Sequence, residues 1–353
     1  TLNYLSGALS HTIGDLTFER NRLRTTLDGL GEGVISVNLN GQIMQYNPSS
    51  VQLLGGVSTD APETLPQFQS LLPQVEEVLK TGLPQVAEHK CREAVVRVTI
   101  SPLRDGGSQV EGAVLLIQDV TESVRLEQTR KDYVANVSHE LRTPLASIRS
   151  LSDALSDGLI KKEDDRKRYY GYIQKESMRL SRLIDDLLEL SRLQSGTIAL
   201  TKQRMDVQEI LYDVAQRYES AARERGLSIR LNVADSFPEV YGNPDRTEQV
   251  LIILLDNAIK HGSADEPLAL GAEISGDKVL VHISNAGTIA EEDIAHLFER
   301  FYKADRSHSG EGTGLGLSIA QEIMSLLDEK IWVQNRNGRV EFTFTLSLNA
   351  EKV

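Results

Sequence analysis

Residues 130–152 read RKDYVANVSHELRTPLASIRSLS and determine the central element of this chain. Apolar side chains recur there at intervals of three or four residues, which predicts an amphipathic helix. They are Val134, Val137, Leu141, Leu145 and Ile148, and the pattern continues through Ser152 to Leu155 just beyond the stretch. The apolar stripe is narrow, as in helices that pack against other helices. His139, Glu140 and Thr143 fall outside it and are expected to project from the flank of the helix.

Pro144 interrupts the hydrogen bonding of this helix one turn after His139. Because proline has no N–H group, it cannot donate to the carbonyl of Glu140, and a bend is expected there. The apolar spacing agrees, since positions 137, 141 and 145 are two successive steps of four, a local break in the heptad pattern.

A second amphipathic helix is predicted over residues 170–191. Its apolar side chains are Tyr170, Ile173, Leu180, Leu183, Ile184, Leu187, Leu188 and Leu190. Asp157-Gly158 and the charged run Lys161–Lys167 indicate the loop between the two helices. A single antiparallel hairpin cannot bury faces this broad, so we expect a homodimer that forms a four-helix bundle.

Composition and charge narrow the class of protein. The chain has 353 residues, 40% of them apolar and 25% charged, which predicts a multidomain globular protein. A net charge of −13 argues against a nucleic-acid-binding surface. The one cysteine cannot form an internal disulfide, which fits a reducing cytoplasm. No run of 18 apolar residues is present, so no membrane span is expected within this sequence.

The patterns divide the chain into regions 1–28, 29–122, 123–195 and 196–353. The first reads as a polar signalling helix. The second reads as strands over 33–38, 42–46, 95–100 and 112–122, with an Asn40-Gly41 hairpin turn and an Asn47-Pro48 helix cap. The third is the helical hairpin.

The last region alternates strands and helices, which predicts a two-layer α/β sandwich and, for the whole chain, a multidomain α+β fold. The expected strands are Thr197–Leu200, Leu227–Val233, Leu268–Ile274, Lys278–Asn285, Ile331–Asn335 and Val340–Leu348. The expected helices are Val207–Arg225, Thr247–His261, Glu291–Phe301 and Leu315–Leu327.

Ser138-His139-Glu140-Leu141-Arg142-Thr143-Pro144-Leu145 resembles the H box of bacterial sensor histidine kinases. The resemblance implies that His139 is phosphorylated by ATP, that Glu140 accepts a hydrogen bond from its imidazole, and that Thr143 positions water for hydrolysis of a partner's phospho-aspartate. A zinc-protease motif, His-Glu-x-x-His, is excluded because position 143 is Thr.

Residues 29–122 resemble a PAS domain in the order of their strands, in Asn47-Pro48 and in the ending Asp119-Val120-Thr121-Glu122. Such folds hold haem, flavin or small metabolites, or serve only to dimerise or transmit a signal. The flavin-photosensor Asn-Cys pair is absent, because Cys91 follows Lys90. His89 as a haem ligand is a weaker alternative than an empty or unidentified pocket, so the PAS ligand stays unknown.

Asp256-Asn257-Ala258-Ile259-Lys260-His261 resembles the N box of the kinase ATP-binding domain. Asn257 offers an amide oxygen to Mg²⁺, and Lys260 and His261 lie near a phosphate in this interpretation. A solvent-facing Asn and Lys at the end of a helix is the structural alternative.

Three further boxes complete the resemblance. Asn285 takes the place of the Asp that fixes adenine, followed by Gly287. Arg300, Tyr302 and Lys303 flank the nucleotide, whereas Phe298 and Phe301 read as core anchors. The glycine-rich stretch supplies backbone to phosphates at the start of a helix, before which Ala304–Ser309 suits a lid. The expected nucleotide-binding residues of the glycine-rich stretch are Gly310, Gly312, Thr313, Gly314, Leu315 and Gly316.

The sequence departs from the family pattern at Ile253, where a second Asn is usual, and at Asn285. The leading hypothesis is a homodimeric, Mg-ATP-dependent histidine kinase that passes phosphate to an aspartate of a response-regulator receiver domain, with phosphatase activity as well. A phosphatase-dominant enzyme and a non-catalytic dimeric PAS scaffold, each with a weakened nucleotide site, are the alternatives. The resemblance implies membrane helices upstream of this cytoplasmic part.

Overall fold

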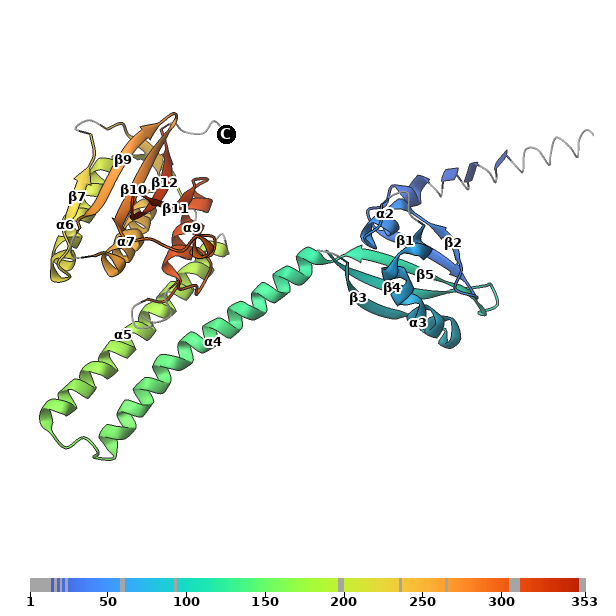
Figure 1. Cartoon of the computed structure of the whole chain (residues 1–353), viewed down its shortest axis with the longest axis horizontal. Helices are drawn as coiled ribbons and strands as arrows, with labels where there is room; N and C mark the ends of the chain where they lie inside the picture. Colours follow the sequence, from blue (N-terminus) through green and yellow to red (C-terminus); the bar gives the residue numbers. More distant parts are fainter. Residues whose placement is uncertain are drawn as a thin grey trace, which may run out of the picture. The chain divides into compact units, whose positions relative to one another are not determined.

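The computed structural model describes residues 14–15, 18–19, 21–22, 25–57, 61–91, 94–195, 200–234, 237–263, 266–304 and 312–348. The chain divides into two compact units, Thr1–Asp132 and Tyr133–Val353 (Figure 1). The helix expected over 1–28 falls largely outside the described residues, although Thr25–Asp28 is helical. In the described part of the chain, none of the helices combines the length and the apolar character that crossing a bilayer requires.

The first unit contains a five-stranded antiparallel sheet in the order β2-β1-β5-β4-β3. Its strands are β1 (Gly33–Asn38), β2 (Ile43–Tyr46), β3 (Gln85–Cys91), β4 (Ala94–Arg104) and β5 (Val110–Asp119). The helical elements that pack with it are α2 (Pro48–Leu53), η1 (Pro62–Thr64) and α3 (Pro66–Thr81). Alternate residues of β5, including Leu115 and Ile117, are fully buried with Phe68 and Val75 of α3.

The four strands expected in this unit are confirmed to within a few residues, apart from β4, which continues to Arg104. The sequence analysis missed β3, which contains His89 and Cys91, and the long helix α3. Pro66 occupies the first turn of α3, where no N–H partner is needed, and Pro73 lies inside the helix.

Asn47 joins three segments of this unit through one buried side chain. Its Oδ1 accepts hydrogen bonds from the N–H groups of Val34 (2.8 Å) and Ser50 (3.1 Å). Its Nδ2 donates to the carbonyls of Leu27 (2.9 Å) and Glu32 (2.8 Å). The predicted cap at the start of α2 is therefore confirmed, and the same amide also fixes the entry to β1.

We predict that Asn47→Ala destabilises this unit by about 2–4 kcal/mol, because four hydrogen bonds of a buried amide are lost together. Urea unfolding followed by far-UV circular dichroism should show an earlier transition. Trp332, the chain's single tryptophan, lies in the second unit and should unfold at an unchanged urea concentration. Asn40→Ala, at an exposed turn, is the control, and equal midpoints for both variants would contradict the prediction.

The second unit begins with two long helices, α4 (Thr121–Ser156) and α5 (Glu163–Gln194), of which α4 belongs to this unit from Tyr133 onward. The helix continues through Pro144, whose side chain is buried. The loop expected over Lys161–Lys167 is wrong from Glu163 onward. Glu163, Asp164 and Asp165 form the first turn of α5, where acidic side chains favour the helix dipole.

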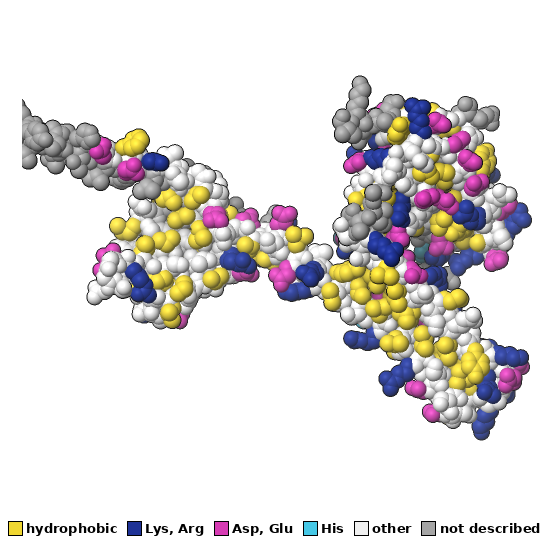
Figure 2. Space-filling view, turned by 180° about the vertical axis from the view of Figure 1, so that it is seen from behind, with side chains coloured by type: hydrophobic (Ala, Val, Ile, Leu, Met, Phe, Trp, Pro, Cys, Tyr) yellow, Lys and Arg dark blue, Asp and Glu magenta, His cyan; other side chains and the backbone are white. Residues whose placement is uncertain are grey.

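The hairpin leaves large apolar side chains exposed on its surface (Figure 2). They include Val134, Leu145, Tyr170, Met178, Ile184 and Leu188. Leu183, Leu190 and Leu193, by contrast, are buried in one apolar core with the α/β part of this unit. One side of α5, including Leu183 and Leu190, is therefore covered within the chain, while several of the other apolar positions predicted to pair helices remain exposed.

The remainder of this unit is a two-layer sandwich with a seven-stranded sheet (Figure 1). The path runs β6-β8-β12-β10-β9-β7, with β11 paired to β12, and only β7 and β9 pair in parallel among the described strands. Its strands are β6 (Gln203–Met205), β7 (Ile229–Asn232), β8 (Val240–Gly242), β9 (Leu268–Ser275), β10 (Lys278–Ala286), β11 (Ile331–Arg336) and β12 (Arg339–Ser347). The longer helices are α6 (Val207–Glu224), α7 (Pro244–His261) and α9 (Gly316–Leu326).

The sandwich confirms the predicted fold class and most of its elements. The helix expected over Glu291–Phe301 is wrong: only α8 (Glu291–Ile294) is an α-helix, and turns follow up to Phe301, whose φ of 65° ends any helical path. Of the strand expected over Thr197–Leu200, residues 197–199 lie outside the described part and Leu200 is not in a strand. The sequence analysis also missed the three-residue strands β6 and β8.

Candidate functional site

His139 and Thr143 lie one turn apart on α4, and both are exposed. The Thr143 hydroxyl donates to the backbone carbonyl of His139 at 3.2 Å, the usual alternative partner for a helical threonine. The imidazole therefore stands on the surface of the hairpin, where a reactant can approach it.

Glu140 is largely buried beside this histidine, between the hairpin and the sandwich. Its Oε2 lies 3.3 Å from the Nζ of Lys303 and 3.7 Å from a guanidinium nitrogen of Arg179 on α5. The three side chains are between 18% and 26% exposed, so water screens these ion pairs only in part. The carboxylate expected to orient the imidazole is thus engaged by two cations.

The segment after α8 brings its basic residues to α4 as well. Arg300 stacks over the ring of Tyr133, with 5.3 Å from the guanidinium carbon to the ring centre, and the Phe301 ring lies 6.0 Å from the same tyrosine. Tyr302 donates a hydrogen bond to Asp293 on α8, and this bond raises the pKa of the tyrosine hydroxyl. Arg300 and Lys303 therefore face the hairpin, and Tyr302 faces α8.

The C-terminal half of α7 carries the predicted cation and phosphate ligands. Asn257 is half-buried, and among the described residues its amide has no hydrogen-bond partner. Lys260, one turn later, forms an ion pair with Asp256, and His261 ends the helix. The buried residues of α7, such as Leu251 and Leu254, anchor the helix in the core and hold this polar end at the surface of the sandwich.

Asn285, near the end of β10, is 4% exposed. Its Nδ2 donates to the carbonyls of Ala286 (3.0 Å) and His261 (3.4 Å). Because both partners are acceptors, the amide nitrogen must face them and the amide oxygen must point elsewhere. Gly287 follows with φ of 130°, a conformation open to glycine.

The glycine-rich stretch is described from Gly312 onward, and Gly310 lies outside the described residues. Gly314 has φ of 71°, and a Cβ there would lie 2.8 Å from the Cα of Phe301, so only glycine fits. The N–H of Phe301 also donates to the carbonyl of Gly314 at 2.8 Å. This bond joins the stretch to the segment that carries Arg300 and Lys303.

Gly316 begins α9 directly against Ile253 of α7. A Cβ at position 316 would lie 3.3 Å from the Ile253 Cγ2 atom. Ile253, the departure noted in the sequence, thus packs under the N-terminus of α9, next to the buried Leu315.

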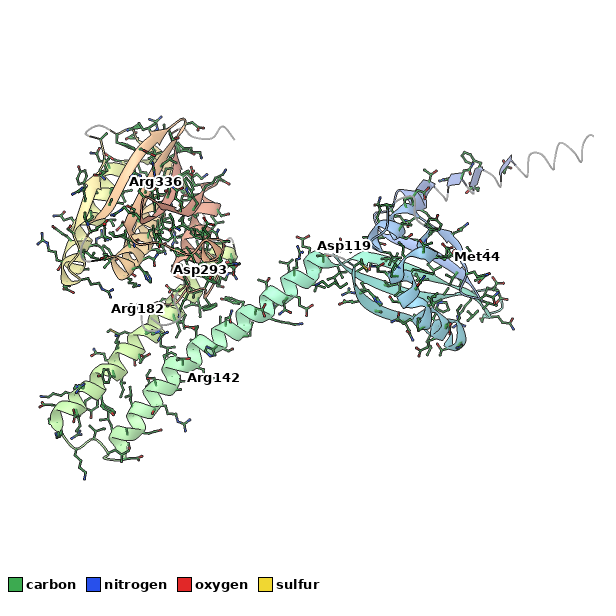
Figure 3. All side chains as sticks on the ribbon, viewed as in Figure 1. Met44, Asp119, Arg142, Arg182, Asp293 and Arg336 are labelled. Carbon is green, nitrogen blue, oxygen red and sulfur yellow. The ribbon has the colours of Figure 1, made fainter. Side chains whose placement is uncertain are left out.

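Asp186 on α5 is a site residue that the sequence analysis missed. The Thr313 hydroxyl donates to its Oδ2 at 2.7 Å. Burial raises the pKa of this carboxyl, while the Thr313 bond and the Lys260 charge act in the opposite direction. Figure 3 labels Arg182 on α5 and Asp293 on α8. The available signal was an acidic pair, Asp185-Asp186, inside an otherwise apolar run.

A second missed contact joins α5 to another element of the sandwich, α7. Arg246 near the start of α7 forms an ion pair with Glu189 of α5 and a 2.6 Å hydrogen bond with Gln249. Glu140, Asp186 and Glu189 are therefore all acidic groups of the hairpin that contact cations or a hydroxyl of the sandwich.

Family models match three parts of the chain. Residues 27–125 match the PAS fold, residues 129–196 match the His Kinase A (phospho-acceptor) domain, and residues 242–350 match the histidine kinase-, DNA gyrase B- and HSP90-like ATPase. These matches include the hairpin with His139 and the sandwich with the glycine-rich stretch, which implies ATP binding by the sandwich.

Curated relatives and solved structures agree with these matches. The sensor histidine kinase WalK of Bacillus subtilis is 30% identical over the whole chain, and the sensor protein SrrB of Staphylococcus aureus is 28% identical over 96% of it. The chain spans only 59% and 57% of the length of these relatives.

Among solved structures, histidine kinase ThkA in complex with response regulator protein TrrA matches 91% of this chain and 97% of its own, with a TM-score of 0.54 and 26% identity. Histidine kinase AdeS of Acinetobacter baumannii matches 60% of this chain and 98% of its own, with a TM-score of 0.51 and 28% identity.

We predict that Asn285→Asp destabilises the sandwich by about 1–3 kcal/mol, although it introduces the acid expected at this position. A carboxylate cannot donate to the carbonyls of Ala286 and His261 and would meet them with like charge. Urea unfolding followed by Trp332 fluorescence measures the effect. Asn232→Asp, at an exposed position of β7, is the control. A stability equal to that of the wild type would show that the amide donor is dispensable.

Proposed function

Because the chain belongs to the two-component sensor histidine kinases, we propose that it transfers the γ-phosphoryl group of ATP to His139 and then to an aspartate of a response regulator. The observation that carries this proposal is the position of His139. It is exposed on α4, next to Glu140, whose carboxylate contacts Lys303 of the ATPase domain. The acceptor and the nucleotide-binding part therefore belong to one unit.

His139 serves as the nucleophile in this proposal. A neutral imidazole nitrogen attacks the γ-phosphorus in line, and phosphoryl transfer needs positioning and charge neutralisation more than covalent help. Four of the other histidines, His261, His282, His296 and His308, belong to the ATPase region itself. A histidine on the separate hairpin can be presented to a nucleotide that the ATPase domain holds.

Glu140 acts next to the nucleophile by accepting a hydrogen bond from the second ring nitrogen, which stabilises the imidazolium that develops. For this role the carboxylate must exchange its contacts with Lys303 and Arg179 for the imidazole. Lys303 is then released to neutralise phosphate charge, as proposed for the residues that flank the nucleotide.

The residues of the sandwich fit a magnesium nucleotide. The half-buried amide of Asn257, which has no hydrogen-bond partner within the described part of the chain, would offer an oxygen of the kind that Mg²⁺ accepts while it keeps waters and phosphate oxygens. When bound, the ion would neutralise the charge of the phosphates. Lys260 adds a positive charge, and the N–H groups at the start of α9 add donors for an anion. The buried Asn285 would recognise adenine through its amide oxygen.

The partner surfaces follow from the hairpin. The exposed apolar side chains of α4 and α5 support a homodimer in which two hairpins form a four-helix bundle. The response regulator would dock on this bundle, and the likeness to ThkA in complex with a response regulator supports that partner. Thr143 would position water when the regulator's phospho-aspartate is hydrolysed.

We predict that incubation with γ-labelled ATP and Mg²⁺ gives a label that is stable to base and lost in acid, as expected for phosphohistidine. His139→Gln should lower incorporation to background, because the attacking nitrogen is removed. His296→Gln, at an exposed histidine of the ATPase domain, should keep the wild-type level.

Incorporation by the His139→Gln variant at the wild-type level would refute His139 as the acceptor. Label in neither protein, combined with measured ATP binding, would refute the kinase proposal as a whole.

A further inference from the structure

Asp186 places a carboxylate at the part of the sandwich where a nucleotide phosphate is proposed to bind. Its Oδ2 accepts the Thr313 hydroxyl at 2.7 Å, and the Thr313 Oγ1 in turn lies 3.3 Å from the N–H of Leu315 at the start of α9. The carboxylate is thus linked through one hydroxyl to the positive end of a helix, a position that favours an anion.

The groups around Asp186 attract negative charge, but the burial of this carboxylate is unfavourable. Lys260 acts on this group with an attractive charge, and so does Arg182. Burial nevertheless disfavours the ionised form, and the adjacent Asp185 adds a repulsive charge. The Asp186–Thr313 hydrogen bond therefore holds a carboxylate whose charged form would be more stable in water. It also lies close to the proposed phosphate ligands Lys260 and Thr313.

We propose that Asp186 is an internal competitor of the nucleotide: its carboxylate occupies the anion-binding position of Thr313 while the sandwich is docked on α5, and a bound phosphate displaces it. This inference rests on the proposed function, because it assumes that the sandwich binds ATP. It adds a hairpin residue that sets nucleotide affinity without belonging to any of the ATP-binding boxes.

The other contacts between hairpin and sandwich link this competition to the chemistry. Lys303, a second proposed phosphate ligand, is held by Glu140 in the same docked arrangement. A nucleotide that attracts both Thr313 and Lys303 therefore removes two of the hairpin's polar contacts at once. Release from Lys303 removes one of the two cations that hold Glu140 and leaves Arg179, so nucleotide binding makes it easier for the carboxylate to turn to His139. Because such coupling is reciprocal, docking weakens nucleotide binding to the same extent.

The test uses the full chain and measures equilibrium binding of the magnesium complex of β,γ-imido-ATP, with adenosine as a ligand that has no phosphate. Asp186→Ala should bind the ATP analogue about three- to tenfold more tightly, because the population of the competent state rises when the competing contact is lost. Its adenosine affinity should remain within about twofold of the wild-type value, since adenosine does not reach the anion position.

Asp185→Ala is the matched control, because this neighbouring carboxylate is exposed. It should bind adenosine like the wild type and the analogue no more tightly than the wild type, because it leaves the Asp186–Thr313 contact in place. Asp186→Asn keeps an acceptor for Thr313 but lacks the charge, and should also bind the analogue more tightly. Trp332 fluorescence verifies that each variant is folded.

Equal affinity of the wild type and both Asp186 variants for the analogue would overturn the inference while leaving the proposed function intact. Equal gains for adenosine and the analogue would overturn it too, because Asp186 would then close the whole site instead of replacing a phosphate. Failure of every folded protein to bind the analogue would instead refute the proposed function, and the inference with it.

Discussion

The packing of one face of α5 against the sandwich is the interaction on which the site depends. Leu183, Leu190 and Leu193 are at most 3% exposed and share a core with the helices of the sandwich. Burial of each leucine contributes about 1.5–3 kcal/mol, whereas a partly screened ion pair contributes about 1 kcal/mol or less. The leucines therefore hold the two parts together, and the polar contacts around them select the arrangement in which they meet.

Because the buried leucines supply most of the stabilisation, individual polar contacts between hairpin and sandwich can be exchanged for others. Two of the three acidic groups of the hairpin that meet the sandwich, Glu140 and Asp186, have partners with another possible use, because Lys303 and Thr313 are proposed nucleotide ligands. Glu140 itself lies beside the proposed nucleophile. An exchange of partners changes the free energy little when the new hydrogen bonds and ion pairs equal the old ones in number and in charge. Two arrangements of similar free energy can then be selected by a ligand, which is the condition for a switch.

Local pattern predicted those elements that local interactions determine. The spacing of apolar residues gave α4, α5, α6 and α7, and Asn47-Pro48 gave the start of α2. The same reasoning extended a helix to Phe301, because Phe298 and Phe301 fit a helical face, whereas the φ of 65° at Phe301 follows from its pairing with Gly314. Likewise, Asp186 and Thr313 are 127 residues apart, and neither sequence pattern contains information about the other. The resemblance predicts ligands for a nucleotide but does not indicate which hairpin residues contact them.

The two departures from the family pattern are matched by their neighbours. Ile253 packs against Gly316, where the absence of a side chain allows α9 to begin close to α7. Asn285 donates to two carbonyls that a carboxylate would repel. An apolar side chain and an amide thus stand at two positions where the family pattern implies other polar groups, and the neighbours suit them: Gly316 leaves room beside Ile253, and two carbonyls accept from Asn285. Under the proposed competition, Asp186 on α5 adds a contact outside the ATP-binding boxes through which the docking of the hairpin influences nucleotide affinity.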